Sequence, residues 1–114
     1  MSIDYRPFME ECERIVRRTG SLIREKAGHV RIFEKGPSDL VTEADLAAQK
    51  LVRELLAQSH PDHLLIGEED TPQWRAAHDP RQVPFAWIVD PIDGTTNYAH
   101  NVPFYCVSLA MAHQ

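Results

Sequence analysis

Residues 85–97 constrain the fold more than any other stretch of the chain. The apolar run 85–89 predicts a short buried strand, because it is too short for a helix and rich in residues that favour β-structure. We expect the strand to end at Asp90-Pro91, since proline cannot donate a hydrogen bond to a neighbouring strand. A polar turn follows and reaches Asn97. The stretch therefore predicts a core strand that carries polar groups to its end.

The first of these polar groups suit a metal ion. Asp90 and Asp93 are three residues apart on a tight turn, so their carboxylates can point at one position. The carbonyl of Ile92 lies between them and can join them. All three groups are oxygen donors, which hard cations such as Mg²⁺ and Ca²⁺ prefer.

The next residues suit an anion. Gly94 lets the backbone pass close to a bound group, and the amides of Gly94, Thr95 and Thr96 can face a phosphate. A helical turn from Thr95 would add helix-terminal amides. The alternative is that Asp-Pro and Asp-Gly are ordinary turn signals with solvated carboxylates. Two acids, the run 94–97 and a buried strand coincide here, which favours a metal and phosphate site.

The composition is that of an ordinary globular protein. With 114 residues, 43% of them hydrophobic and 25% charged, the chain can bury one modest core, so we expect one domain or a piece of one. The net charge of −5 gives no support to a nucleic-acid or acidic-membrane partner. The sequence has no apolar run of membrane-spanning length and no signal-peptide pattern behind Met1, so we expect a cytoplasmic protein.

The cysteines and histidines have no metal-binding spacing. Cys12 and Cys106 lie among apolar neighbours, and we expect both to be small buried residues in a reducing compartment. A disulfide between them is the less favoured alternative. The six histidines are scattered, and we expect them on the surface or in loops, with only His100 near the predicted site.

Two amphipathic helices are predicted. Apolar residues at steps of three and four indicate a helix over 5–27, ended by Gly28. Thr42 and Asp45 have the spacing of a capping box, which predicts a second helix to about Gln58. The expected buried stripes are Phe8, Met9, Cys12, Ile15, Val16, Thr19, Leu22, Ile23 and Ala27 in the first helix and Leu46, Ala48, Leu51, Val52, Leu55 and Leu56 in the second.

Short strands account for most of the remaining chain. In addition to 85–89, they are predicted at 29–35, 40–41, 63–67 and 103–112, with a turn at 36–39 and a polar connection without regular structure at 71–84. Two helices against these strands make an α+β fold. Some strand partners are expected to be missing from this chain, and the exposed strand 104–111 is expected to drive self-association into a homo-oligomer.

A third acid, Glu68, follows the predicted strand 63–67. It therefore resembles Asp90 and Asp93, which follow a strand of their own, and ligands from adjacent strand ends are a common way to build a site on a rigid base. A cation held by these acids, the Ile92 carbonyl and water would neutralise phosphoryl oxygens and lower the pKa of an attacking water. Hydrolysis of a phosphate monoester requires both effects.

Three blocks of the chain resemble the inositol monophosphatase family. They are 39–45, 66–69 and 87–97, and the last has the form of the family signature Asp-Pro-Ile/Leu-Asp-Gly-Thr/Ser. The resemblance implies a magnesium-dependent, lithium-sensitive phosphomonoesterase. It also implies two long helices packed on a mainly antiparallel sheet, the N-terminal part of the layered α/β sandwich of the inositol monophosphatase and fructose-1,6-bisphosphatase type.

The resemblance also implies roles for single residues, with two or three Mg²⁺ ions. The implied metal ligands are Glu68, Asp90, the Ile92 carbonyl and Asp93. The implied phosphate ligands are the amides of Gly94, Thr95 and Thr96. Asp90 would bridge two ions, and the catalytic residues Thr95 and Glu68 would position or activate the water. Asp45 would accept a hydrogen bond from Thr95.

Simpler roles compete with these assignments. Asp45 is also the acid of the predicted capping box, and we expect that its carboxylate cannot serve the helix and the threonine equally. Glu69 is expected to have no ligand role, Asn97 to brace the turn and Trp87 to lie in the core. Lys35 lies near a loop that in the family contributes to a further metal site.

Family members are longer than this chain, and their later part supplies a further aspartate ligand and most contacts to the substrate alcohol. We therefore expect residues 1–114 to be the N-terminal metal- and phosphate-binding segment, with the C-terminal half absent. The expected reaction is hydrolysis of inositol monophosphate to inositol and phosphate. The expected partner is therefore a small-molecule phosphate ester, and the expected oligomeric state is a dimer. The alternatives are a related phosphatase for fructose bisphosphate, a nucleotide 3′-phosphate or histidinol phosphate, and a truncated non-catalytic protein that binds metal or a partner.

Overall fold

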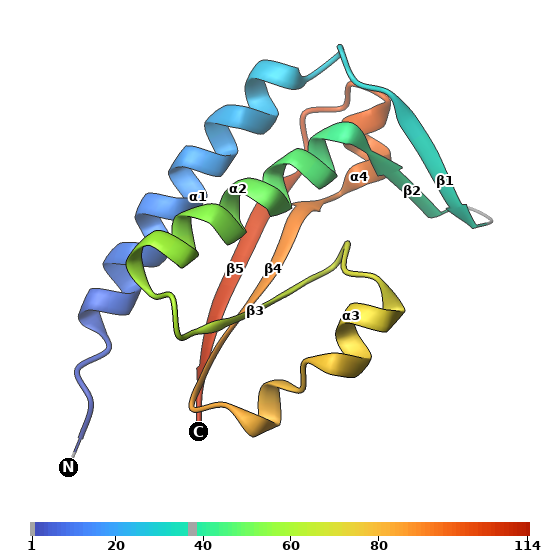
Figure 1. Ribbon diagram of the computed structural model, residues 1–114. Helices are drawn as coiled ribbons and strands as arrows, with labels where there is room; N and C mark the ends of the chain where they lie inside the picture. Colours follow the sequence, from blue (N-terminus) through green and yellow to red (C-terminus); the bar gives the residue numbers. More distant parts are fainter. Residues whose placement is uncertain (1, 37–38) are drawn as a thin grey trace.

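The computed structural model describes residues 2–36 and 39–114, in which two long helices pack against one face of a sheet (Figure 1). The helices and strands are α1 (Arg6–Lys26), β1 (Ile32–Gly36), β2 (Asp39–Thr42), α2 (Glu43–Ser59), β3 (Leu64–Gly67), α3 (Pro72–Ala77), η1 (Pro80–Gln82), β4 (Phe85–Asp93), α4 (Thr95–Ala99) and β5 (Cys106–His113). Pro37 and Ser38 of the predicted turn lie outside the described residues. No helix within the described ranges is long and apolar enough to cross a membrane.

Both long helices form where the sequence predicts them. Gly28 follows α1 with a φ of +80°, a left-handed conformation that suits glycine. At the start of α2, the Thr42 hydroxyl accepts hydrogen bonds from the amides of Ala44 and Asp45, and Asp45 Oδ2 accepts one of 2.8 Å from the Thr42 amide. This is the predicted capping box.

The predicted stripes contain most of the apolar residues that each helix buries, but several of their members are only partly buried. Ile15, Thr19 and Ile23 of α1 are buried, but Met9 is 67% exposed. In α2, Leu46 is 47% exposed. Met9 and Leu46 each lie beside the buried face of their helix, and periodicity alone does not fix how wide that face is.

The central strand is β4, which pairs with β3 in parallel and with β5 antiparallel. A separate hairpin pairs β1 with β2 antiparallel, so the strand pairing is mainly antiparallel, as expected. The parallel pair has a specific consequence: Gly67 lies opposite Val89, so β3 and β4 end at the same edge of the sheet. Glu68, which follows β3, therefore lies near the polar residues at the end of β4.

The prediction that the central strand ends at Asp90-Pro91 is wrong, because β4 continues to Asp93 through a bulge. Asp90 lies opposite Ser108 and Asp93 opposite Cys106, so β4 has one residue more than β5 between these pairs. The extra residue interrupts the ladder at Pro91, where a missing N–H removes no strand hydrogen bond. Because of the bulge, Asp90 and Asp93 lie on the same face of the sheet.

The covered face of the sheet packs against α1 and α2 (Figure 1). Trp87 is fully buried at its centre, as predicted. The cluster around it consists of Ile15, Val52, Leu55, Leu56, Leu65, Trp87 and Val89. A second cluster, under the ends of β3 and β4, consists of Ile23, Ala44, Ala48, Ile92 and Tyr98.

The opposite side of β4 and β5, here called the open face, is largely exposed. It consists of Ile88, Asp90, Asp93, Cys106, Ser108 and Ala110, which lie in register across the two strands. The expectation of a buried Cys106 is therefore wrong, since its strand has no covering layer on this side. Both cysteines are free.

His60 and His63 lie in the loop between α2 and β3, which agrees with the expectation of surface or loop positions. His60 and His63 are half-buried beside Phe8 and Phe85, with 4.6 Å between the two imidazole centroids. Trp87 Nε1 donates a 2.9 Å hydrogen bond to His63 Nδ1. Burial, followed by the charge of His60, lowers the pKa of His63.

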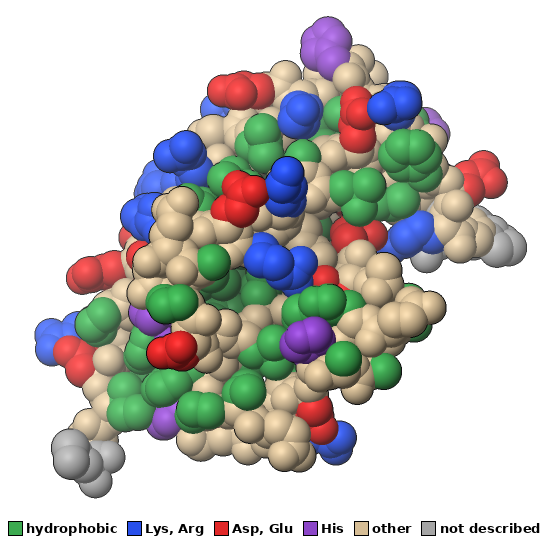
Figure 2. Space-filling model, viewed as in Figure 1, with side chains coloured by type: hydrophobic (Ala, Val, Ile, Leu, Met, Phe, Trp, Pro, Cys, Tyr) green, Lys and Arg blue, Asp and Glu red, His purple; other side chains and the backbone are tan. Residues whose placement is uncertain are grey.

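The region 71–84 was expected to lack regular structure, but it contains α3 and η1. Thr71 caps α3 and Asp79 caps η1. Both elements are short, so they leave no helical period in the sequence. On the surface that includes α1, α2 and α3, Lys and Arg side chains are interspersed with Asp and Glu (Figure 2).

Candidate metal and phosphate site

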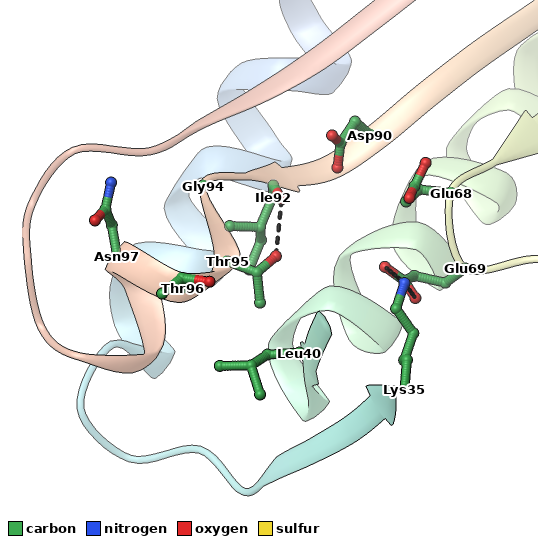
Figure 3. Close-up of a pocket in the computed structure, with 10 residues that line it drawn as sticks. All are labelled: Lys35, Leu40, Glu68, Glu69, Asp90, Ile92, Gly94, Thr95, Thr96 and Asn97. Atoms are coloured by element: carbon green, nitrogen blue, oxygen red, sulfur yellow. Dashed lines mark hydrogen bonds and ion pairs between the residues drawn. The ribbon is translucent and has the colours of Figure 1, made fainter. Parts of the chain in front are cut away.

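Most of the predicted site residues line one pocket at the shared end of β3 and β4 (Figure 3). The pocket has a volume of about 310 Å³. It is lined by Lys35, Leu40, Glu68, Glu69, Asp90, Ile92, Gly94, Thr95, Thr96 and Asn97. Two predicted residues are not among them: Asp45 lies behind Thr95, and Asp93 lies beside the pocket.

The carboxylates of Glu68 and Asp90 lie at the same end of the pocket (Figure 3). The amide of Glu68 donates a 3.1 Å hydrogen bond to the carbonyl of Val89, which ties the turn after β3 to β4. Burial raises the pKa of Asp90, and the charges of Glu68, Asp93 and Asp45 raise it further. The fold therefore gathers negative charge at this point, where a bound cation would offset it.

Asp93 contributes to this charge from outside the pocket. Its side chain is exposed and borders a neighbouring hollow with Phe104 and Cys106. Within residues 2–36 and 39–114, no group of three or more His, Cys, Asp or Glu side chains is arranged to hold a metal ion. Mg²⁺ commonly uses one or two carboxylates and completes its shell with water. Glu68, Asp90 and the Ile92 carbonyl fit that kind of site.

Thr95 is held by two acceptors. Its hydroxyl lies 2.8 Å from Asp45 Oδ1 and 3.0 Å from the Ile92 carbonyl oxygen. A hydroxyl has one proton to donate and can also accept, so its oxygen remains available as an acceptor in the pocket. Asp45 itself is fully buried.

Asp45 serves both the helix and the threonine. Its Oδ2 accepts from the amide and the hydroxyl of Thr42, while its Oδ1 accepts from Thr95. The expectation that one carboxylate cannot serve both is therefore wrong, because the two oxygens point to different partners. The start of α2 and the orientation of Thr95 depend on one side chain.

Gly94 begins the turn that faces Asp90. Its φ is +102°, and an added Cβ would lie 3.0 Å from the carbonyl oxygen of Phe104, so the position requires glycine. The predicted helical turn, α4, starts at Thr95, and the first amides of a helix have no acceptor within it. Asn97 braces the turn as predicted, since its Nδ2 donates to Phe104 at 3.0 Å.

Comparison with known proteins identifies the family. Residues 4–114 match the inositol monophosphatase family. The chain belongs to this family. An inositol monophosphatase from Mesembryanthemum crystallinum is 39% identical over 106 residues, which cover 91% of this chain and 38% of that protein.

Solved structures show the same fold. The IMPase of Thermotoga maritima superposes with a TM-score of 0.82 at 29% identity, covering 94% of this chain and 40% of that chain. An IMPase/NADP phosphatase complexed with Mg²⁺ and phosphate gives a TM-score of 0.68 at 28% identity, covering 93% and 38%. The predicted α+β fold of the inositol monophosphatase type is confirmed. This chain spans about two fifths of the length of these relatives.

In this family member, Lys35 and Glu69 form an ion pair at the rim of the pocket. Lys35 Nζ lies 3.2 Å from Glu69 Oε2, and the Glu69 side chain is only 6% exposed. Burial raises the pKa of Glu69, and the nearby Lys35 works against this rise. The β1–β2 hairpin is thereby joined to the turn that carries Glu68.

Three residues around that turn were not anticipated from the sequence. Gln49, Arg53 and Asp70 hydrogen-bond to the backbone and side chains of the turn from outside the pocket. They belong to no recognisable motif. The spacing of Gln49 could have indicated that it lies near the site, because it follows Asp45 by one helical turn and is therefore on the same face of α2.

Proposed function

We propose that residues 1–114 form the N-terminal metal- and phosphate-binding segment of an inositol monophosphatase-type domain that hydrolyses a phosphate monoester with Mg²⁺. The proposal rests mainly on one observation: Glu68 and Asp90 line a single pocket together with the first residues of α4. This arrangement provides oxygen ligands for a cation beside amides for a phosphate. The relative complexed with Mg²⁺ and phosphate supports it.

The proposed metal ligands keep the pattern predicted from the sequence. Glu68, Asp90 and the Ile92 carbonyl would hold a first ion, and Asp93 would take part in a second, with two or three ions in total. A cation at this position would neutralise phosphoryl oxygens and lower the pKa of an attacking water. The gathering of carboxylates around Asp90 supports this assignment, since burial and then the charges of Glu68, Asp93 and Asp45 raise the pKa of that residue.

The remaining roles are positioning the water and binding the phosphate, and we assign them to Thr95, Glu68 and the first amides of α4. Thr95, oriented by Asp45 at 2.8 Å, would position the water together with Glu68. The amides of Gly94, Thr95 and Thr96 would hold the phosphate at the start of α4. These groups supply orientation and electrostatic stabilisation, the main contributions of a protein to phosphate ester hydrolysis.

Inositol monophosphate is the proposed substrate, because the family match names that activity. The alternatives remain fructose bisphosphate, a nucleotide 3′-phosphate and histidinol phosphate, and a non-catalytic metal- or partner-binding protein. We further propose inhibition by lithium, assembly as a dimer and a cytoplasmic location.

The test compares Mg²⁺-dependent phosphate release from inositol 1-phosphate by the chain, by Asp90→Asn and by Asp62→Asn. Asp90→Asn should lower the rate about 100-fold, because several kcal/mol of charge stabilisation depend on the cation. Asp62 is exposed and outside the pocket, so Asp62→Asn removes the same charge and should keep the full rate. Equal rates for all three would overturn the proposed role of Asp90, and absence of release by the unaltered chain would overturn catalysis by residues 1–114 alone.

A further inference from the structure

The turn that carries Glu68 and Glu69 is attached to α2 by one glutamine. Gln49 Oε1 accepts a 2.9 Å hydrogen bond from the amide of Glu69, and its Nε2 donates one of 2.8 Å to Asp70 Oδ1. Gln49 is only 5% exposed, and it lies outside the pocket. A single side-chain amide therefore contacts two consecutive residues of the turn.

Asp70 closes the same turn from the other side. Its Oδ2 accepts a 2.7 Å hydrogen bond from the amide of Gly67, and its Oδ1 also accepts one of 3.0 Å from Arg53 Nη2. The Asp70 side chain is 3% exposed. Both carboxylate oxygens are engaged, so the carboxylate is a fixed part of the turn.

Gly67 shows how closely α2 approaches the end of β3. A Cβ at this position would collide with the side-chain amide of Gln49. Gly67 does not have a positive φ, so glycine is needed here for space. The Gln49 amide thus packs directly on the last residue of β3, immediately before Glu68.

The same helix also holds the other half of the pocket. Asp45 precedes Gln49 by one turn of α2 and accepts from Thr95 on α4. Residues four apart lie on one helix face about one turn from each other. One rigid element therefore fixes the turn after β3 through Gln49 and the turn after β4 through Asp45.

We propose that Gln49 and Asp70 are positioning residues that set the affinity of the pocket for a divalent cation. They hold the backbone of the turn so that the Glu68 carboxylate stays in place relative to Asp90. Mg²⁺ requires nearly ideal octahedral geometry, and groups that orient ligands commonly change metal affinity by 10- to 100-fold. This inference rests on the proposed function, since it assumes that Glu68 and Asp90 bind the cation.

The experiment measures Mn²⁺ binding to the full chain by electron paramagnetic resonance titration, with Mn²⁺ as the probe. Gln49→Glu keeps an acceptor for the Glu69 amide, but it places a carboxylate oxygen against Asp70. The two like charges should push the turn out of position. We expect the Mn²⁺ dissociation constant to rise about tenfold or more.

A second substitution should restore binding. In the double variant Gln49→Glu/Asp70→Asn, the new amide at position 70 can donate to the new carboxylate at position 49 and still accept from Gly67, although Arg53 loses Asp70 Oδ1 as an acceptor. The net charge remains −5, because one acid is gained and one lost. We expect the Mn²⁺ affinity to return to within about threefold of the original value, an effect that general loss of stability does not produce.

Val52→Ala is the matched control, since Val52 lies on α2 three residues after Gln49, belongs to the main core cluster and is fully buried. It should lower the unfolding midpoint and leave the Mn²⁺ affinity unchanged at a temperature where all variants are folded. Equal affinities for the unaltered chain and Gln49→Glu, or a double variant as weak as the single one, would overturn this inference alone. Absence of Mn²⁺ binding by the unaltered chain would overturn the proposed function as well.

Discussion

The two faces of β4 differ sharply over a single step of the chain. Trp87 is fully buried on the covered face, whereas its neighbour Ile88 is 41% exposed on the open face. The covered face packs against both long helices and holds the main hydrophobic cluster. The open face carries Asp90 and Asp93. One strand thus separates the groups that stabilise the fold from the groups that can perform chemistry.

This division has a physical reason. An ionised carboxylate is costly to bury without a partner, so carboxylates that bind a cation need access to water while the cation is absent. Aliphatic and aromatic side chains stabilise the fold only where water is excluded. A strand whose side chains alternate between faces satisfies both requirements with adjacent residues.

The largest effect on stability is expected at the centre of the covered face. Trp87→Ala should lower the free energy of unfolding by about 3–5 kcal/mol, because it leaves a cavity in a closely packed cluster. Urea denaturation followed by circular dichroism measures this change. Trp74→Ala, on the short helix α3 and only partly buried, should cost much less. Equal losses for the two tryptophans would contradict the comparison.

An intermediate effect is expected at the rim of the covered face, where His63 accepts from Trp87. Burial lowers the pKa of His63 below its usual value of 6.5, so the unfolded chain binds a proton more readily than the folded one. Stability should therefore fall as the pH decreases below about 6.5. Protonation of Nδ1 would also remove the acceptor for Trp87 Nε1.

The urea midpoint measured between pH 5 and pH 8 tests this dependence. His63→Gln has no proton to gain in this range and keeps a side-chain acceptor, so its midpoint should vary less with pH. His60 and Asp62 influence the same imidazole, His60 by lowering its pKa and Asp62 by raising it. An unchanged slope in His63→Gln would show that another group is responsible.

The smallest effect on stability is expected on the open face. Ala110 is exposed and lies opposite Ile88, so Ala110→Lys should change the free energy of unfolding by less than about 0.5 kcal/mol. It should nevertheless reduce self-association, because lysine on an exposed strand opposes pairing with another chain. Light scattering measures this difference. A monodisperse monomer for the unaltered chain would refute self-association through this face.

Local patterns predicted most of the elements and the central part of the site. The capping box of Thr42 and Asp45, the glycine after α1 and the strand at residue 85 each have a signal within a few residues. The acidic residues at the end of β4 were likewise found from adjacent residues. A local sequence pattern predicts an element well when neighbouring residues alone determine that element, as in a helix cap or a turn.

Features that depend on distant residues were not predictable in this way. The separate use of the two oxygens of Asp45 depends on Thr95, fifty residues later. The contact of Gln49 with Gly67 depends on how α2 packs against β3. The exposure of Cys106 depends on the layer that β5 lacks on one side. Each requires the tertiary arrangement, which no single window of sequence contains.

The bulge in β4 makes the site sensitive to chain length as well as to residue type. Asp90 and Asp93 share a face only because one additional residue lies between their register partners. Insertion of one residue between Asp90 and Asp93, with the single bulge kept, would turn Asp93 toward the helices, with every site residue still present in the sequence. An insertion in the connection at 78–84 would only lengthen a surface segment. Tolerance to insertions and deletions should therefore fall abruptly between these two parts of the chain.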